Sequence, residues 1–244
     1  MSSLRQLIRR LRGSLLAPVL IETNARFDRL ERNRLAAQMD TEALIRLQAV
    51  LRPRLAWTAY ALRPGNLECV INEINLHGRT SLLELGTGIS TLYIAALCPD
   101  CHVVSVDESA EWQTVVSAEA KRLGIDEGRI SYRAVPLKPA PAICADWYDP
   151  ELLGRSLGQK RFDAILVDAP KSDRQNRRGG AFHHLGPWLA EDFVWLLDDA
   201  LRPEIAALCQ EWSDRNKWRL EHDRSGRLAI LRPDQTRAPY AISP

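Results

Sequence analysis

The sequence predicts an α/β fold, because short apolar segments of strand length alternate with segments of helical periodicity between about residues 66 and 231. Two observations carry this prediction. The apolar run at residues 81–85 leads directly into a glycine turn that opens a helix, and the next apolar run, at 102–106, ends in two acids. Continuous apolar runs are typical of parallel strands buried on both faces. Ligands bind such sheets at the carboxyl ends of the strands.

The glycine turn is the first candidate site. Gly86 and Gly88 let the backbone turn tightly and approach a ligand closely. Ser90 and Thr91 can cap the following helix, and such a turn presents free N–H groups and the positive end of a helix dipole. An ordinary strand-to-helix connection could use the same residues. The residues that we expect to bind a ligand here are Glu84, Gly86, Thr87, Gly88 and Ser90.

The acids after the second strand make this signal more specific. Asp107 and Glu108 lie about 20 residues after the glycines, where an acid accepts the hydroxyls of a ribose. The third strand is expected at 130–135, and its end, at Val135, should approach the adenine of a nucleoside cofactor. The turn and the acids together predict a nucleoside-binding site.

The glycine pattern distinguishes a dinucleotide from a nucleoside cofactor without a pyrophosphate. Thr91 stands where a dinucleotide-binding turn has its third glycine. Glu84 suits a cofactor with a positive amine or sulfonium better than one with phosphates. On these residues the chain resembles the class I S-adenosylmethionine-dependent methyltransferases, whose first motif is an acid followed by x-G-x-G, matched here by ELGTG at 84–88. The resemblance covers about residues 63–232 and implies S-adenosylmethionine as cofactor. It also implies a Rossmann-like, doubly wound, mostly parallel sheet of seven strands with an antiparallel last strand.

The remaining elements follow from periodicity and turn residues. Residues 136–157 are proline-rich and are expected to be irregular, apart from a short helix after Pro150. The segment entering the first strand should lie near the cofactor mouth, so Trp57, Thr58 and Tyr60 could contact ligand there or pack as core residues. Further strands are expected at 162–170, 193–197, 218–222 and 227–231, and helices at 66–76, 110–123 and 203–216.

The chain divides into a helical extension or cap at residues 1–62 and a cofactor-binding domain at 63–244. The extension begins as a basic amphipathic helix that Pro18 should interrupt, and one or two exposed helices should continue to about residue 51. These helices could pack on their own domain, close over a substrate, form a homodimer or lie on a membrane surface.

Three acids follow the fourth and fifth expected strands. Asp168, Asp198 and Asp199 should converge at one edge of the crevice, because neighbouring parallel strands end there. Unpaired carboxylates repel one another, and Mg²⁺ would relieve that repulsion, since it prefers oxygen ligands. Backbone N–H groups and nearby arginines could hold the acids apart instead. The same residues could also simply end a strand and begin a loop.

These acids extend the resemblance to the metal-dependent O-methyltransferases of the catechol, caffeoyl-CoA and macrolide-sugar type. That resemblance implies Asp168, Asp198 and Asp199 as metal ligands. It implies Lys171, three residues after the first acid, as the group that deprotonates the acceptor hydroxyl. Pro170 beside the lysine and the basic stretch that follows depart from the pattern.

The basic stretch is expected to form a mobile loop beside the site. Arg174, Arg177 and Arg178 could bind a phosphate or carboxylate of the acceptor, or could simply be solvated. His183, or His184 beside it, could act as the base instead of lysine, because histidine titrates nearer to neutral pH.

Composition limits the other classes of function. The formal net charge of +2, from 33 basic and 31 acidic residues, gives no clear signal for nucleic acid. Five cysteines, an odd number scattered through apolar segments, favour a reducing compartment. No segment reaches the ~18 to 20 apolar residues of a transmembrane helix. We therefore expect a cytoplasmic protein.

The sequence favours an S-adenosylmethionine-dependent methyltransferase that acts on oxygen of a small-molecule or sugar-like (glycan-like) acceptor, with Mg²⁺ as an assisting ion. A metal-independent N- or C-methyltransferase of the same fold is the alternative. A catalytically silent cofactor-binding partner protein is a third hypothesis. A nucleotide-dependent oxidoreductase is disfavoured by the missing third glycine.

Overall fold

A computed structural model of the chain describes residues 2–143, 145–171 and 178–233. Its main feature is a seven-stranded sheet in the order β3-β2-β1-β6-β7-β9-β8. The first five strands in this order are parallel, and β9 is antiparallel to both of its neighbours. The predicted doubly wound sheet with an antiparallel last strand is confirmed. The strands are β1 (Ser81–Leu85), β2 (His102–Asp107), β3 (Ile130–Ala134), β6 (Phe162–Val167), β7 (Leu189–Leu197), β8 (Trp218–His222) and β9 (Ala229–Pro233).

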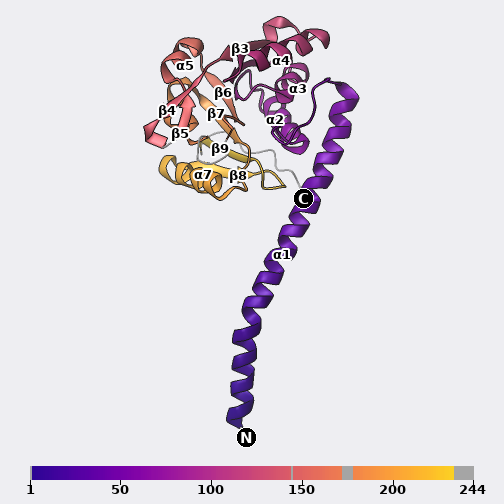
Figure 1. The fold of residues 1–244 in the computed structure, drawn as a ribbon, viewed down its shortest axis with the longest axis vertical. Coiled ribbons are helices and arrows are strands. Elements are labelled where there is room, and N and C mark those ends of the chain that lie inside the picture. Colours follow the sequence, from indigo (N-terminus) through magenta and orange to yellow (C-terminus); the bar gives the residue numbers. More distant parts are fainter. Residues whose placement is uncertain (1, 144, 172–177, 234–244) are drawn as a thin grey trace.

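Helices cover both faces of this sheet (Figure 1). Leu82 packs with residues of the helices on one face, and its neighbour Leu83 packs on the other, because successive strand residues point to opposite faces. The first face carries α2 (Pro64–His77), α3 (Ile89–Leu97) and α4 (Ala110–Arg122), and the second carries α5 (Pro150–Leu157), α6 (Gly179–His184) and α7 (Pro203–Asn216). Three short 3₁₀ helices lie at Glu127–Arg129, Pro141–Ile143 and Gly186–Trp188.

Two segments differ from the expectation. Residues 136–157 contain an antiparallel hairpin, β4 (Leu137–Ala140) and β5 (Ala145–Tyr148), before α5. The hairpin has prolines in and beside its first strand, which hid the strand pattern. The second segment, expected to be a mobile basic loop, includes α6, whose residues 179–182 are buried. Arg174 and Arg177 lie outside the described residues.

The N-terminal extension is one helix, α1 (Ser2–Val50), of 49 residues. The expected interruption at Pro18 is wrong, since a proline can bend a helix without ending it. Ala36, Ala43 and Leu47 are buried, whereas Ile21 and Phe27 are 69% and 65% exposed. Among the α1 residues whose burial is described, those that pack on the α/β domain therefore lie in the last part of the helix, and Figure 1 shows the helix extending away from the domain. The homodimer through this extension stays a prediction.

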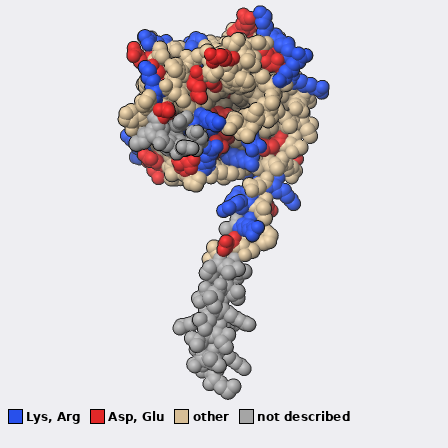
Figure 2. Space-filling view, in the orientation of Figure 1, with Lys and Arg blue, Asp and Glu red and all other residues tan. Residues whose placement is uncertain are grey.

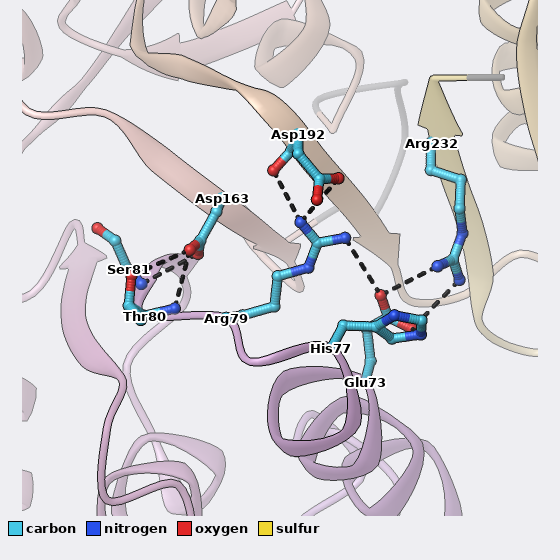
Figure 3. A network of polar contacts seen from close by, with 8 residues as sticks. All are labelled: Glu73, His77, Arg79, Thr80, Ser81, Asp163, Asp192 and Arg232. Atoms are coloured by element: carbon cyan, nitrogen blue, oxygen red, sulfur yellow. Dashed lines mark hydrogen bonds and ion pairs between the residues drawn. The ribbon is translucent and has the colours of Figure 1, made fainter. Parts of the chain in front are cut away.

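The edge of the sheet opposite the glycine turn carries a buried ionic network (Figure 3). Glu73 of α2 pairs with Arg232 of β9 at 3.2 Å, and its other oxygen lies 3.8 Å from Arg79. Arg79 also donates to the backbone oxygen of Asp192 in β7, at 2.7 Å. Buried pairs of this kind contribute little net stability, but removing one partner is destabilising because the other charge is left buried and unpaired. The network ties α2 to two strands far from the glycine turn.

Two smaller expectations can be compared with the described residues. The described cysteines, Cys69, Cys98, Cys101 and Cys209, are free, and the last three are buried. No described helix combines the length and apolar character that crossing a membrane would require.

Candidate functional site

A cleft of about 1160 Å³ lies at the carboxyl edge of the sheet. Its walls come from the glycine turn, the ends of β2, β6 and β7, and the segment 55–63 between α1 and α2. Both signs of charge line it: Arg63, Lys171, Arg178, Arg202 and Arg227 against Asp107, Glu108, Asp168, Asp198 and Asp199. In Figure 2 as well, basic and acidic side chains are mixed over the visible face, and both border its hollow. The mixed lining fits a small polar ligand better than a polyanion.

The glycine turn forms one wall of the cleft. Gly86 has a φ of +105°, a region that side-chain-bearing residues rarely adopt, and a Cβ there would lie 3.0 Å from that of Ala169. Gly88 is extended, and a Cβ added to it would meet no protein atom within 4 Å. Gly86 is therefore needed for the turn itself, whereas Gly88 leaves space facing the cleft that it lines.

Asp107, at the end of β2, is held rigidly in the cleft wall. Its Oδ2 accepts a hydrogen bond from the N–H of Thr87, and its Oδ1 accepts one from the N–H of Ser109, both at 2.9 Å. Each oxygen keeps a lone pair for a ligand. Burial raises the pKa of this carboxyl. Trp112 of α4 lines the same wall and donates from Nε1 to the oxygen of Thr87 at 2.7 Å.

Glu84 lies beneath the turn and not in the cleft lining. Its carboxylate is fully buried and accepts hydrogen bonds from the hydroxyls of Ser90 and Thr91, both at 2.6 Å, and of Ser105 at 2.9 Å. Burial raises its pKa to about 7, although the hydroxyl hydrogen bonds act in the opposite direction. The acid expected to face a cofactor amine instead supports the turn from below.

Most of the expected site residues come together at the cleft. Val135 does not, because it is fully buried in the core. His183 is exposed on α6 with its ring 6.2 Å from that of Trp212, and His184 stacks on Trp147. Those that line the cleft are Gly86, Thr87, Gly88, Ser90, Asp107, Glu108, Asp168, Lys171, Asp198 and Asp199.

The segment before α2 forms the opposite wall of the cleft. Thr58 and Tyr60 line the cleft as expected, whereas Trp57 does not and packs against the core, with its ring 6.0 Å from that of Tyr93. Lys171 lies with its Nζ 4.0 Å from the centre of the Tyr60 ring, within the range of a cation–π contact. The lysine that follows β6 is thereby placed beside residues that precede α2.

The three acids after β6 and β7 converge as expected, but they converge on Arg178. Its guanidinium lies 3.2 Å from Asp168 Oδ1, 3.1 Å from Asp199 Oδ2 and 3.9 Å from Asp198 Oδ2. Burial, and then the neighbouring Asp198, raises the pKa of Asp168 well above its usual value, and Arg178 acts in the opposite direction. Asn66 donates to Asp198 Oδ1 at 2.7 Å.

This arrangement does not fit the Mg²⁺ site that the resemblance implies. Mg²⁺ requires about six oxygen ligands at roughly 2.0–2.1 Å, and the guanidinium of Arg178 occupies the point where the carboxylates meet. Among the described residues, no group of three or more His, Cys, Asp or Glu side chains is arranged to hold a metal ion. The positions of the acids after strands predicted that they would converge. Of the alternatives that the sequence left open, nearby arginines holding the acids apart agrees with the position of Arg178.

Comparisons with known proteins bear on the fold. No model of a protein family matches the sequence, and no curated protein matches it. Solved structures do. A caffeoyl-CoA O-methyltransferase-like protein from Staphylococcus aureus is 14% identical with a TM-score of 0.56, covering 84% of this chain and 99% of its own. The chain has the class I methyltransferase fold.

Two further solved structures have this methyltransferase fold, and one of them is named for a reaction other than O-methylation. An S-adenosylhomocysteine-bound methyltransferase from Podospora anserina is 15% identical with a TM-score of 0.59, covering 83% of this chain and 95% of its own. A precorrin-6y C5,15-methyltransferase from Geobacter metallireducens is 9% identical with a TM-score of 0.53, covering 75% and 95%. At these identities the likeness establishes the fold and leaves the acceptor open.

Proposed function

We propose that the chain is a cytoplasmic S-adenosylmethionine-dependent methyltransferase that acts on oxygen of a small-molecule or sugar-like acceptor. The observation that carries the proposal is Asp107, held between two backbone N–H groups beside the open face of Gly88. An acid at the end of the second strand, next to a glycine turn, is the arrangement that binds a ribose. When bound, the cofactor would supply a methyl group activated by a sulfonium.

The cofactor half of the cleft would then be shared among a few residues. The carboxylates of Asp107 and Glu108 would accept the ribose hydroxyls, and the turn at Gly86 and Gly88 would lie against the methionine part. Trp112 would flank the nucleoside, because its indole N–H is fixed on Thr87 and its ring stays at the cleft. These contacts orient the cofactor before any chemistry occurs.

The acceptor half supports transfer to oxygen. A hydroxyl must lose its proton as it attacks a methyl group, so a base has to lie within reach of the acceptor. Lys171 lines the cleft beside Tyr60, and of the three side chains proposed as bases, Lys171, His183 and His184, it is the one that does so. Lys171 would take the acceptor proton as the neutral amine and become the ammonium that lies against Tyr60. Thr58 and Tyr60 would contact the acceptor from the other side.

Calorimetric titration of wild-type protein with S-adenosylmethionine and with NAD tests the cofactor. Losing a charged hydrogen-bond partner costs about 1.5–3 kcal/mol. Asp107→Ala should therefore weaken S-adenosylmethionine binding by roughly tenfold to a few hundredfold. Asp107→Asn keeps an acceptor oxygen and should lose less. Asp100→Ala removes an exposed acid that does not line the cleft and is the matched control.

Unchanged affinity in Asp107→Ala, with circular dichroism showing an intact fold, would remove the cofactor assignment. An acceptor panel of hydroxylated aromatics and sugars, followed by release of S-adenosylhomocysteine, then tests the reaction. Tight cofactor binding without turnover on any member of the panel would favour the catalytically silent partner.

A further inference from the structure

We propose that Arg178 takes the place of a divalent cation among Asp168, Asp198 and Asp199, so that methyl transfer by this protein needs no metal. The part about transfer rests on the function proposed above. The part about the cation rests on the geometry of Arg178 alone and can be tested without an acceptor.

Arg178 joins the ends of β6 and β7. Its Nη2 donates to the backbone oxygen of Asp168 at 2.8 Å, and its Nη1 donates to that of Asp198 at 2.7 Å. The same guanidinium lies at 3.1–3.2 Å from carboxylate oxygens of Asp168 and Asp199. A planar guanidinium with several donors suits this task, because it can pair with carboxylates and carbonyls at the same time.

The position of Arg178 is set by buried packing. The residue is 5% exposed and immediately precedes α6. Gly180 of that helix lies against Trp147 so closely that a Cβ on the glycine would overlap the indole ring. Phe182 packs between Trp195 and Trp212, with ring centroids at 4.7 and 3.9 Å. This packing fixes the backbone from which the side chain of Arg178 extends, and a cation that displaced the guanidinium would have to break its hydrogen bonds to the backbone oxygens of Asp168 and Asp198.

The carboxylates also have other donors. Asn66 donates to Asp198 Oδ1 at 2.7 Å, and Arg202 lies 2.9 Å from Asp199 Oδ2. A dication entering the cluster would compete with these donors and would be repelled by the guanidinium. Arg178 is thus a positioning residue. It neutralises the acids and holds the backbone of Asp168, from which the chain continues to Lys171 in the cleft.

Titration with Mn²⁺ alone, followed by the electron paramagnetic resonance signal of the free ion, tests this inference. Wild-type protein should bind Mn²⁺ no more tightly than Asp168→Asn, and its circular dichroism and melting temperature should be unchanged by EDTA. Arg178→Ala removes the internal cation and should bind one Mn²⁺ at least tenfold more tightly than wild type. Arg178→Lys retains a positive charge and should not gain this affinity. Adding Asp198→Asn to Arg178→Ala should abolish the gain.

Tight binding of one Mn²⁺ by wild-type protein that is lost in Asp168→Asn would overturn the inference, because the acids would then form a metal site. A folded Arg178→Ala protein without gained affinity would overturn it as well. If Arg178→Ala does not fold, the comparison of wild type with Asp168→Asn still decides. Calorimetry with S-adenosylmethionine on the same wild-type sample separates the two proposals. If wild-type protein does not bind S-adenosylmethionine, the proposed function is refuted. If wild-type protein binds Mn²⁺ tightly, the proposed role of Arg178 in place of a cation is refuted.

Discussion

Glu84 gives a pH dependence of stability that can be worked out from its surroundings. The side chain is fully buried beneath the glycine turn, and burial raises its pKa from 4.5 to about 7. In the folded protein it therefore keeps a proton that the unfolded chain releases above about pH 4.5. Stability from this group is present at acidic pH and is lost as the pH rises through about 7.

The size of the effect follows from the pKa difference. One pKa unit corresponds to about 1.4 kcal/mol. Ionisation of Glu84 should therefore lower the free energy of unfolding by about 3 kcal/mol between pH 4.5 and pH 8. For a chain of this length, each kcal/mol moves the melting temperature by about 2–4 °C. Glu84→Gln, which cannot ionise, should lack this contribution.

Thermal melts by circular dichroism at several pH values between 5.5 and 8.5 measure the difference. The melting temperature of Glu84→Gln, relative to that of wild type, should rise by several degrees as the pH increases over this range. The other titrating groups are common to both proteins, so their effects cancel in the comparison. Glu127→Gln, with its side chain 84% exposed, is the control and should follow wild type. A constant difference between Glu84→Gln and wild type over the whole range would show that Glu84 is already ionised at pH 5.5, and the reasoning from burial would fail.

Three further predictions concern the cleft itself. Gly86→Ala places a side chain at a φ of +105° against Ala169, so its melting temperature should fall, since such strain costs about 1–3 kcal/mol. Gly88→Ala should melt like wild type but bind S-adenosylmethionine more weakly in calorimetry, because its Cβ meets no protein atom; equal binding would place the cofactor elsewhere. Lys171→Ala should slow transfer by about 10²–10⁴-fold, measured as S-adenosylhomocysteine release, with little change in cofactor affinity. Lys171→Arg should not restore the rate, since arginine stays protonated. A larger loss in His183→Ala would assign the base to that histidine.

The sheet and the cleft wall formed by the glycine turn and Asp107 could be predicted because their signals are local. A continuous apolar run, a glycine turn and an acid about 20 residues later follow one another along a short stretch of chain. The structure places Gly86, Gly88 and Asp107 together as that spacing indicates. The helix at Pro203–Asn216 was likewise predictable from its periodicity and the proline at its start.

The acid cluster shows where such reasoning stops. Strand ends predicted that Asp168, Asp198 and Asp199 would converge, but the cation among them depends on the packing of a short helix. That packing involves Gly180 and the distant Trp147, and no pattern along the chain records it. The sequence offered nearby arginines as one way to hold the acids apart, but it could not show which arginine would be buried among them.

The orientation of the Glu84 side chain also could not be predicted from the local sequence. The motif placed an acid before the glycines, but whether it faces ligand or core depends on hydroxyls from three separate positions. Ser90, Thr91 and Ser105 supply them, and the last comes from the neighbouring strand. Their presence was a usable signal, since a buried carboxylate needs such donors.

The helix α1 is long and contacts the α/β domain near its carboxyl-terminal end. At 1.5 Å per residue, a helix of 49 residues is about 70 Å long, and it is clamped near one end. The clamp is Asp40, which accepts a hydrogen bond from the N–H of Gly65 and pairs with Arg227 in the cleft lining, both at 3.1 Å. Through Asp40 and Arg227, the carboxyl-terminal part of α1 is therefore joined directly to the lining of the cleft.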